Sequence, residues 1–269
     1  MTPGADIDPL ARVHPGAVIG EGTTVGAFAV IGPQVKIGRH CKIGASSVVD
    51  GHTAIGDGTE VFPFASIGLP PQDLKYKGEP STLTIGSDCL IREGVTINPG
   101  TEGGGMVTRV GNRCLFMVGA HVAHDCQIGD HVIMANNATL GGHVVIEEHA
   151  IIGGLSAVHQ FVRIGRHAIV GGMSGVEHDL IPYAMAMGDR ARLHGLNVVG
   201  LKRHGFDRGQ IQILNTAYQM LFADSDTLTE RVDRVAAELG TDKGVQDIVA
   251  FVRAGSTRAL CRPKPGDGG

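Results

Sequence analysis

Residues 122–146 read VAHDCQ IGDHVI MANNAT LGGHVV I, and each group of six opens with an apolar residue. The same six-residue period covers residues 13–67, 85–97 and 110–176, where Ile and Val are the commonest first residues. The second residue of the unit is usually Gly, and the fifth is small or β-branched. Repeats of this length are typical of parallel β-helices, in which each hexad supplies one short strand and one turn.

The hexads predict the fold class of most of the chain. Three units make one triangular coil of 18 residues, so we predict an all-β domain, a left-handed parallel β-helix, over residues 1–189. The first residue of each unit should point inward. We expect the second-position Gly to supply a backbone angle that a Cβ would resist.

The six-residue period is lost after Met187, and apolar residues then recur at helical spacing. We predict a small α-helical C-terminal domain over residues 190–262 that caps the open end of the β-helix. A disordered tail should follow over residues 263–269. Asp207 is a candidate N-cap for the first helix. The helical segments are residues 208–224, 228–239 and 245–253.

Two segments interrupt the period, at residues 69–82 and 101–109. The first carries Asp73 and Lys75. The second has a run of glycines, residues 103–105, which we interpret as a flexible loop tip. Interruptions of a regular solenoid often carry function, so we expect both loops to contribute to a site.

Composition argues against several classes of protein. The net charge of −4 argues against a nucleic-acid-binding protein. The sequence has neither an apolar signal core nor an apolar run of about 18 residues, so we expect no integral membrane segment. Its five Cys residues form no CxxC pair, and four take the inward fifth position of a hexad. We interpret them as reduced core thiols and expect a cytoplasmic location.

Histidines and one carboxylate gather in the middle of the repeat. One coil of 18 residues added to Asp125 reaches His143, and the same step from His124 reaches Gly142. His159 lies two residues before the position one further coil beyond His143. We therefore expect these residues to lie together along one edge of the prism. A carboxylate that orients an imidazole there would make an acid/base site.

Two other interpretations of the histidines stay open at this point. A zinc site built from His121, His124 and His143 of adjacent subunits would suit this fold class, but it leaves Asp125 and Lys75 without a role. Single histidines at exposed corners need no function. We interpret four of them in this way: His40, His52, His131 and His149.

A basic segment follows the repeat. It reads LKRHGF at residues 201–206 and sets Lys202, Arg203 and His204 together. Such clusters are most often solvated surface. Near the end of the prism, this one could dock an anionic phosphate or an acidic carrier.

Several motifs together resemble the acyl-carrier-protein–UDP-N-acetylglucosamine O-acyltransferases. They occur in the order found in that family and extend over nearly the whole chain. The resemblance implies transfer of a 3-hydroxyacyl chain from acyl-carrier protein to the 3-position of UDP-N-acetylglucosamine, the first step of lipid A synthesis. The similar runs are GLPPQDLKY (68–76), HVAHDC (121–126), ANNATLGGHV (135–144), IIGGLSAVHQF (151–161) and GLKRHGF (200–206).

The resemblance also implies roles for individual residues. His124 matches the base that takes the proton from the sugar 3-hydroxyl, Asp125 the carboxylate that orients it, and Gly142 the backbone N–H that holds the thioester oxyanion. The reaction would be a direct transfer without an acyl-enzyme, and no cofactor or metal is expected. The implied substrate-binding residues are Asp73, Lys75, His121, His143, His159, Gln160, Asn197 and Arg203.

One further position concerns the length of the acyl chain. Gly172 lies where the family places the far end of the acyl groove, and Met173 follows it here. Since neighbours in a short strand face opposite ways, we expect Met173 to leave open the groove beside Gly172.

The family works as a homotrimer with its sites between neighbouring prisms, so the same assembly is expected here. The acyl chain length stays open, as does the choice between a 3-hydroxyl and a 3-amino acceptor. A related N-acyltransferase and a zinc hydratase of the γ-carbonic-anhydrase type are the alternatives. This chain departs from the family pattern at Pro99, Arg190, Val199 and His204.

Overall fold

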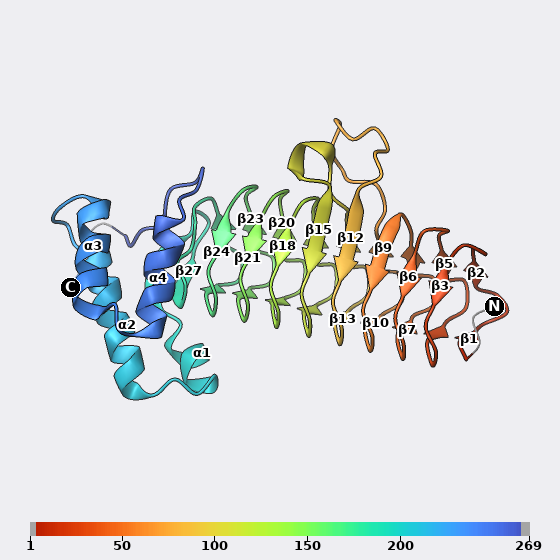
Figure 1. The fold of residues 1–269 in the computed structure, drawn as a ribbon, viewed down its shortest axis with the longest axis horizontal. Helices are drawn as coiled ribbons and strands as arrows, with labels where there is room; N and C mark the ends of the chain where they lie inside the picture. The colour runs from red at the N-terminus through yellow and green to blue at the C-terminus, as the bar shows by residue number, and fades with distance from the viewer. Residues whose placement is uncertain (1–3, 265–269) are drawn as a thin grey trace.

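The computed structural model describes residues 4–264, which form an elongated three-sided prism (Figure 1). The N-terminus lies at one end and the helices lie at the other. Three sheets make the sides, and each coil of the chain adds one short strand to each sheet. The predicted fold class, a left-handed parallel β-helix followed by a helical C-terminal part, is confirmed.

The first sheet also closes the C-terminal end of the prism. Its neighbouring strands are parallel except for the last, β28, which is antiparallel to β27. The strands are β1 (Asp6–Ile7), β4 (Thr24–Val25), β7 (Lys42–Ile43), β10 (Glu60–Val61), β13 (Leu90–Ile91), β16 (Leu115–Phe116), β19 (Ile133–Met134), β22 (Ile151–Ile152), β25 (Ile169–Val170), β27 (Ala184–Met187) and β28 (Arg192–Leu196).

The second and third sheets are parallel throughout. The second consists of β2 (Arg12–Val13), β5 (Val30–Ile31), β8 (Val48–Val49), β11 (Ser66–Ile67), β14 (Thr96–Ile97), β17 (His121–Val122), β20 (Thr139–Leu140), β23 (Ala157–Val158) and β26 (Gly175–Val176). The third consists of β3 (Val18–Ile19), β6 (Lys36–Ile37), β9 (His52–Ile55), β12 (Thr82–Ile85), β15 (Val107–Val110), β18 (Gln127–Ile128), β21 (Val145–Ile146) and β24 (Arg163–Ile164).

The two loops lengthen single coils without disturbing the stack. Paired residues ordinarily lie 18 positions apart, as Val25 and Ile43 do. Around the first loop the interval becomes 30, from Val61 to Ile91, and around the second it becomes 25, from Ile91 to Phe116. The strands on both sides of each loop stay paired, so the loops extend from the corners while the sheets continue.

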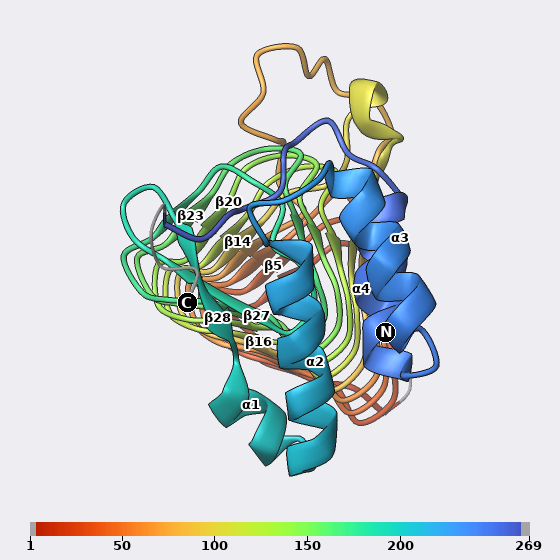
Figure 2. The same cartoon turned by 90° about the vertical axis from the view of Figure 1, so that its left-hand side faces the viewer.

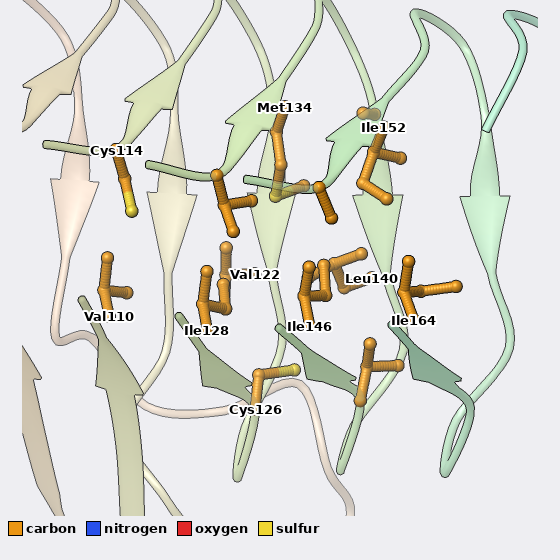
Figure 3. Close-up of a cluster of buried hydrophobic side chains, with 14 of the residues drawn as sticks. Val110, Cys114, Val122, Cys126, Ile128, Met134, Leu140, Ile146, Ile152 and Ile164 are labelled. Atoms are coloured by element: carbon orange, nitrogen blue, oxygen red, sulfur yellow. The ribbon is translucent and has the colours of Figure 1, made fainter. Parts of the chain in front are cut away.

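The interior is filled by the first and fifth residues of the hexads (Figure 3). Ile128 pairs with Ile146, and Ile146 with Ile164, while Cys114 and Cys126 occupy fifth positions nearby. All five are at most 4% exposed. Burying an aliphatic side chain of this size contributes about 1.5–3 kcal/mol. Because each side chain lies over its equivalent in the next coil, the core depends on an unbroken register.

The predicted reason for the second-position glycines is wrong. The left-handed backbone angle falls on the fourth residue of the hexad, which is often not Gly, as at His131 with φ 58° and Asn137 with φ 57°. Gly111 instead lies against the next coil. A Cβ there would be 2.6 Å from the carbonyl carbon of Gly129 and 2.7 Å from the amide nitrogen of Asp130. Close approach between coils therefore explains the glycine.

The three predicted helices are confirmed. They are α2 (Arg208–Leu221), α3 (Leu228–Leu239) and α4 (Lys243–Arg253). Asp207 caps α2 in a capping box with Gln210, as its position in the sequence predicted. Helix α4 starts two residues earlier than expected because Asp242 provides its N-cap. Within residues 4–264, no helix has the length and apolar character needed to cross a membrane.

The hairpin β27–β28 and the short helix α1 (Val198–Arg203) were not predicted. They are too short for a periodic pattern, and the hairpin covers the open edge of the first sheet. The chain then returns to the prism, where Pro263 pairs with Leu193. The expected disorder is therefore wrong at Pro263, while residues 265–269 of the predicted tail lie outside the described residues.

The close approach of the coils can be tested by adding a single methyl group. Gly111→Ala should lower the free energy of unfolding by about 1–3 kcal/mol, because the backbone of the next coil cannot yield easily. Chemical denaturation of the variant and the wild type measures the change. Gly103→Ala is the matched control, since a Cβ at Gly103 has no neighbour within 4 Å. Equal losses in both variants would contradict the explanation.

Candidate functional site

Each prism edge is a column of corners that join two sheets. The corners from the second sheet to the third make the loop edge, from which both inserted loops project (Figure 1, Figure 2). Corners from the first sheet to the second make the apolar edge, which exposes Leu10, Phe28, Phe64, Leu155 and Met173. Corners from the third sheet to the first make the histidine edge, which carries His131, His149 and His167.

His124 and Asp125 occupy the third and fourth positions of one corner on the loop edge. His124 Nδ1 lies 2.8 Å from Asp125 Oδ2. The carboxylate is fully buried, whereas 16% of the imidazole is exposed. A carboxylate only accepts, so Nδ1–H donates to it and the His124 Nε2 is left with a free lone pair. This is the geometry of an oriented general base.

The second inserted loop closes over Asp125. The backbone N–H of Thr101 donates to Oδ1 at 3.0 Å, and the Thr101 hydroxyl donates to Oδ2 at 2.6 Å. The short 3₁₀ helix Glu102–Gly104 packs so closely that a Cβ at Gly104 would lie 2.1 Å from Asp125 Oδ2. Gly104 is therefore more than part of the flexible tip that we expected. It allows the loop to contact and bury a charged group that the loop also satisfies with hydrogen bonds, whereas Gly103 and Gly105 have no such neighbour.

His143 lies one coil beyond Asp125, as the 18-residue step predicts. Its Nδ1 is 3.9 Å from Asp125 Oδ2, and its ring makes an edge-to-face contact with His124 at 5.0 Å. Phe161, one coil further, stacks on the other side at 4.3 Å. Burial lowers the pKa of His143, although the charges of Asp125 and Asp73 act in the opposite direction. Burial therefore favours the neutral form of His143.

Gly142 lies against the imidazole ring of His124. A Cβ at this position would be 2.6 Å from His124 Nε2, so no side chain fits. Among the described residues, nothing accepts a hydrogen bond from the Gly142 N–H. A free amide beside a general base can stabilise an oxygen that becomes negative during the reaction.

The first loop brings Asp73 and Lys75 to the same edge. Asp73 Oδ1 accepts from the backbone N–H of Lys75 at 2.9 Å. Glu79 joins the two loops, because its Oε1 accepts from the backbone N–H of Glu102 at 3.1 Å. The Lys75 side chain is exposed and has no ion-pair partner within residues 4–264, so its ammonium is available to a ligand.

His121, His159 and Gln160 lie around this centre without touching the pair. The Nδ1 of His121 is 2.6 Å from the hydroxyl of Thr96, and burial, followed by the charge of His124, lowers the pKa of its imidazole. His159 is exposed, and its Nδ1 lies 2.6 Å from Arg258 Nη2. The carbonyl of Gln160 also accepts from Arg258 Nε at 3.1 Å, so the C-terminal segment reaches this end of the edge.

Asn197 and Arg203 lie away from the loop edge within one chain. Asn197 caps α1 by accepting from the Gly200 N–H at 3.1 Å, and it donates to the carbonyl of His167 at 2.9 Å. Helix α1 and the inserted loops are on opposite sides of the prism (Figure 2). The Arg203 side chain is exposed on that helix and has no ion-pair partner in the described part of the chain.

Gly172 and Met173 also lie away from the loop edge. They form a corner of the apolar edge after β25, so they belong to a turn. The expectation that they face opposite ways as neighbours in a strand is therefore wrong. Met173 takes the left-handed fourth position with φ 56° and is 74% exposed. A Cβ at Gly172 would meet only Gly154, at 3.3 Å from its carbonyl oxygen.

Four residues of the site were not identified from the sequence: Thr101, Thr108, Phe161 and Arg258. Thr108 accepts a hydrogen bond from the backbone N–H of Asp125 at 2.7 Å. The 18-residue step from His143 would have identified Phe161. Thr101 and Arg258 come from a loop and from the C-terminal segment, where the hexad period gives no signal.

Only two of the three residues of the zinc alternative, His124 and His143, come together within the chain. Side-chain atoms of His124, Asp125 and His143 lie within 4.8 Å of one another and could hold a metal ion. His121 is instead bonded to Thr96. Both oxygens of Asp125 already accept from Thr101 and His124, so this group is more completely explained as an oriented base.

The prism and its edge site define a class, the hexapeptide-repeat acyltransferases. The bacterial transferase hexapeptide profile matches residues 16–51 and 108–142, and the profile described as "Udp N-acetylglucosamine O-acyltransferase; Domain 2" matches residues 179–261. The acyl-[acyl-carrier-protein]–UDP-N-acetylglucosamine O-acyltransferase of Methylobacterium radiotolerans is 54% identical over 204 residues, 76% of this chain and 75% of the relative.

A second relative of the same name and a solved structure also match this chain. The enzyme of the same name from Rhizobium etli is 47% identical over 84% of this chain and 83% of its own length. The crystal structure of the UDP-N-acetylglucosamine O-acyltransferase of Moraxella catarrhalis superposes with a TM-score of 0.91 at 36% identity, covering 95% of this chain and 99% of that one. The chain belongs to the acyl-[acyl-carrier-protein]–UDP-N-acetylglucosamine O-acyltransferase family.

The contact between the second loop and Asp125 can be tested at Thr101. Thr101→Val keeps the shape and the backbone donor but removes the hydroxyl that donates to Asp125. A hydrogen bond to a charged group contributes about 1.5–3 kcal/mol, so turnover should fall about 10- to 100-fold. Thr101→Ser, which keeps the hydroxyl, is the control and should stay close to wild type. Full turnover in Thr101→Val would show that the hydroxyl does not support the pair.

Proposed function

We propose that this protein transfers a 3-hydroxyacyl chain from acyl-carrier protein to the 3-hydroxyl of UDP-N-acetylglucosamine, the first step of lipid A synthesis. The observation that carries the proposal is the buried Asp125 hydrogen-bonded to His124, with the free N–H of Gly142 beside the same imidazole. The substrates, an acyl-carrier protein and a UDP-sugar, are those in the names of the related enzymes.

The chemistry follows from the orientation of His124. Its Nε2 removes the proton from the sugar 3-hydroxyl while that oxygen attacks the thioester carbon. The thioester carbonyl oxygen becomes negative and is held by the Gly142 N–H. When the carbon–sulfur bond breaks, the imidazolium returns the proton to the leaving thiol of the carrier. Asp125 stabilises the imidazolium between these two transfers, so no covalent acyl-enzyme is needed.

The substrate contacts follow from the same edge. Lys75 offers an ammonium without an ion-pair partner among the described residues, and His143, packed between His124 and Phe161, can form a hydrogen bond with a substrate. We assign Asp73, His121, His159 and Gln160 to the remaining contacts with the acceptor and the acyl chain. Their positions around the pair, on neighbouring corners and strands, support this assignment.

The site becomes complete when chains assemble, and we propose a homotrimer. The base lies on the loop edge, whereas the other proposed substrate residues, Asn197, Arg203 and Gly172, lie elsewhere on the prism. A neighbouring copy can present these residues to the loop edge. The exposed Phe28, Phe64 and other side chains of the apolar edge supply apolar surface for such packing.

We place the reaction in the cytoplasm. The five cysteines of the chain are buried as free thiols, as a reducing compartment allows. Both proposed substrates, a carrier protein and a nucleotide sugar, are water-soluble molecules.

The role of the base is tested by His124→Ala. Loss of a general base costs about 10²- to 10⁴-fold in rate, so turnover should fall by that amount while the melting temperature stays close to wild type. Asp125→Asn should cost less, since the hydrogen-bonding shape survives and only the charge and the orientation are lost. Mass spectrometry of the acylated sugar nucleotide measures both.

Two results would contradict these roles. His124→Ala with more than about a tenth of wild-type turnover would remove His124 as the base. A larger loss in Asp125→Asn than in His124→Ala would reverse the assignment of base and orienting group. His40→Asn is a suitable control for handling and purity, because His40 is an exposed corner residue with a left-handed φ of 54° that Asn tolerates, and it lies away from both the base and the apolar edge.

Gly172 is proposed to set the length of the acyl chain. Gly172→Met should shift the preference toward shorter donors, because its side chain would project from an open corner into the space between chains. Each buried methylene is worth roughly 0.8 kcal/mol, so excluding several methylenes changes selectivity by orders of magnitude. Competition between carrier proteins with different acyl chains measures the shift. Gly172→Ala is the control, and an unchanged preference in an active Gly172→Met places the end of the groove elsewhere.

A further inference from the structure

The histidine edge carries a ladder of imidazoles. His131, His149 and His167 occupy the fourth positions of three successive corners, all with left-handed φ angles between 54° and 61°. Their rings stack in parallel, with centroids 4.6 Å apart between His131 and His149 and 4.7 Å apart between His149 and His167. His149 is therefore not the single exposed corner expected from the sequence, because it is packed between two other rings.

A fourth imidazole, that of His204, makes edge-to-face contacts with two rings of this ladder, His149 and His167. His204 follows α1, and its ring centroid lies 4.9 Å from that of His149 and 4.9 Å from that of His167. The three rings therefore form a nearly equilateral triangle. Ring nitrogens of His149, His167 and His204 all lie within 4.8 Å of one another.

The chemical state of these rings suits a ligand set. Burial, assisted by the neighbouring charge of His149, lowers the pKa of His167 to about 4, and burial also lowers the pKa of His149. Both shifts favour the neutral imidazole, the form that binds a metal ion. The Nδ1 of His167 is also buried without a hydrogen-bond partner. A buried polar atom of this kind calls for a bound water or ion.

We propose that His149, His167 and His204 bind one divalent cation of the borderline class that imidazole prefers, with Zn²⁺ as its representative. Three imidazoles and one water would complete a tetrahedral shell. Zinc–nitrogen bonds of about 2.0–2.1 Å hold the ligand nitrogens about 3.4 Å apart, so the parallel rings of His149 and His167 must tilt out of their stack to point at a shared ion. The ion links α1 to two coils of the prism.

This link has a structural consequence. Asn197 caps α1 and donates a hydrogen bond to the carbonyl of His167, which connects this helix to the β-helix. A cation shared by His204 and the two corner histidines would hold this short helix, and with it Arg203, in one position. The site is therefore structural, and it is separate from the His124–Asp125 pair on the loop edge.

The test uses the full-length, tag-free chain, from which metal ions are first removed with a chelator. The stripped protein is then titrated with Co²⁺, and Zn²⁺ is added afterwards. The wild type should bind one ion per chain and give the visible absorption of tetrahedral Co²⁺, which Zn²⁺ then displaces. His204→Gln should weaken binding by more than about 100-fold, since even an outer partner of a metal ligand is worth about 10- to 100-fold. His204 is exposed, so this variant should fold.

Two variants serve as matched controls. His131→Gln changes the ladder but not the triangle, and His124→Ala removes the other group of possible ligands; both should bind as the wild type does. Zn²⁺ should also raise the melting temperature of the wild type but not that of His204→Gln. The proposal is overturned if the wild type binds no ion, if His204→Gln binds as tightly as the wild type, or if His124→Ala abolishes binding.

Discussion

Parallel pairing at an interval of 18 residues is the constraint on which the rest of the structure depends. Each residue must lie over its equivalent in the next coil, as Val122 lies over Leu140 and Ile128 over Ile146. The interval packs the aliphatic core, requires glycine where backbones approach, and makes straight columns of the corner residues. The same rule that fills the interior therefore also places Asp125 under His143 and His124 beside Gly142.

The site adds one feature that stacking alone does not provide, a buried charge. An unpaired carboxylate would be costly in the interior of a protein, but Asp125 accepts hydrogen bonds from His124 and from both donors of Thr101. The inserted loop can supply Thr101 because a corner can lengthen while the strands on both sides stay paired. The His124–Asp125 pair and its loop are thus built at a corner without interrupting the core.

The three edges of the prism carry different kinds of residues. The loop edge carries the His124–Asp125 pair, the apolar edge exposes large side chains, and the histidine edge meets α1. A single chain has no edge that carries all the residues assigned to the substrates. This separation is what makes assembly of several copies a functional requirement in our account.

The hexad period was enough to predict the fold class, the inward residues and the pairing of Asp125 with His143, because each follows from a fixed interval. The local capping signal at Asp207 was equally informative about the start of α2. Two contacts could not be predicted from the sequence, that of Thr101 with Asp125 and that of His204 with His149. Both depend on the path of an irregular segment. The glycine interpretation failed because the period does not distinguish a close approach from a positive φ.

The most direct measurement is nitrogen-15 NMR of the His124 ring in the full-length protein. The account requires that Asp125 hold the proton on Nδ1, so that neutral His124 presents a bare Nε2 to the acceptor hydroxyl. The spectrum should show a protonated Nδ1 and an unprotonated Nε2, and Asp125→Asn should reduce this preference. A neutral His124 protonated on Nε2 in the wild type would contradict the account.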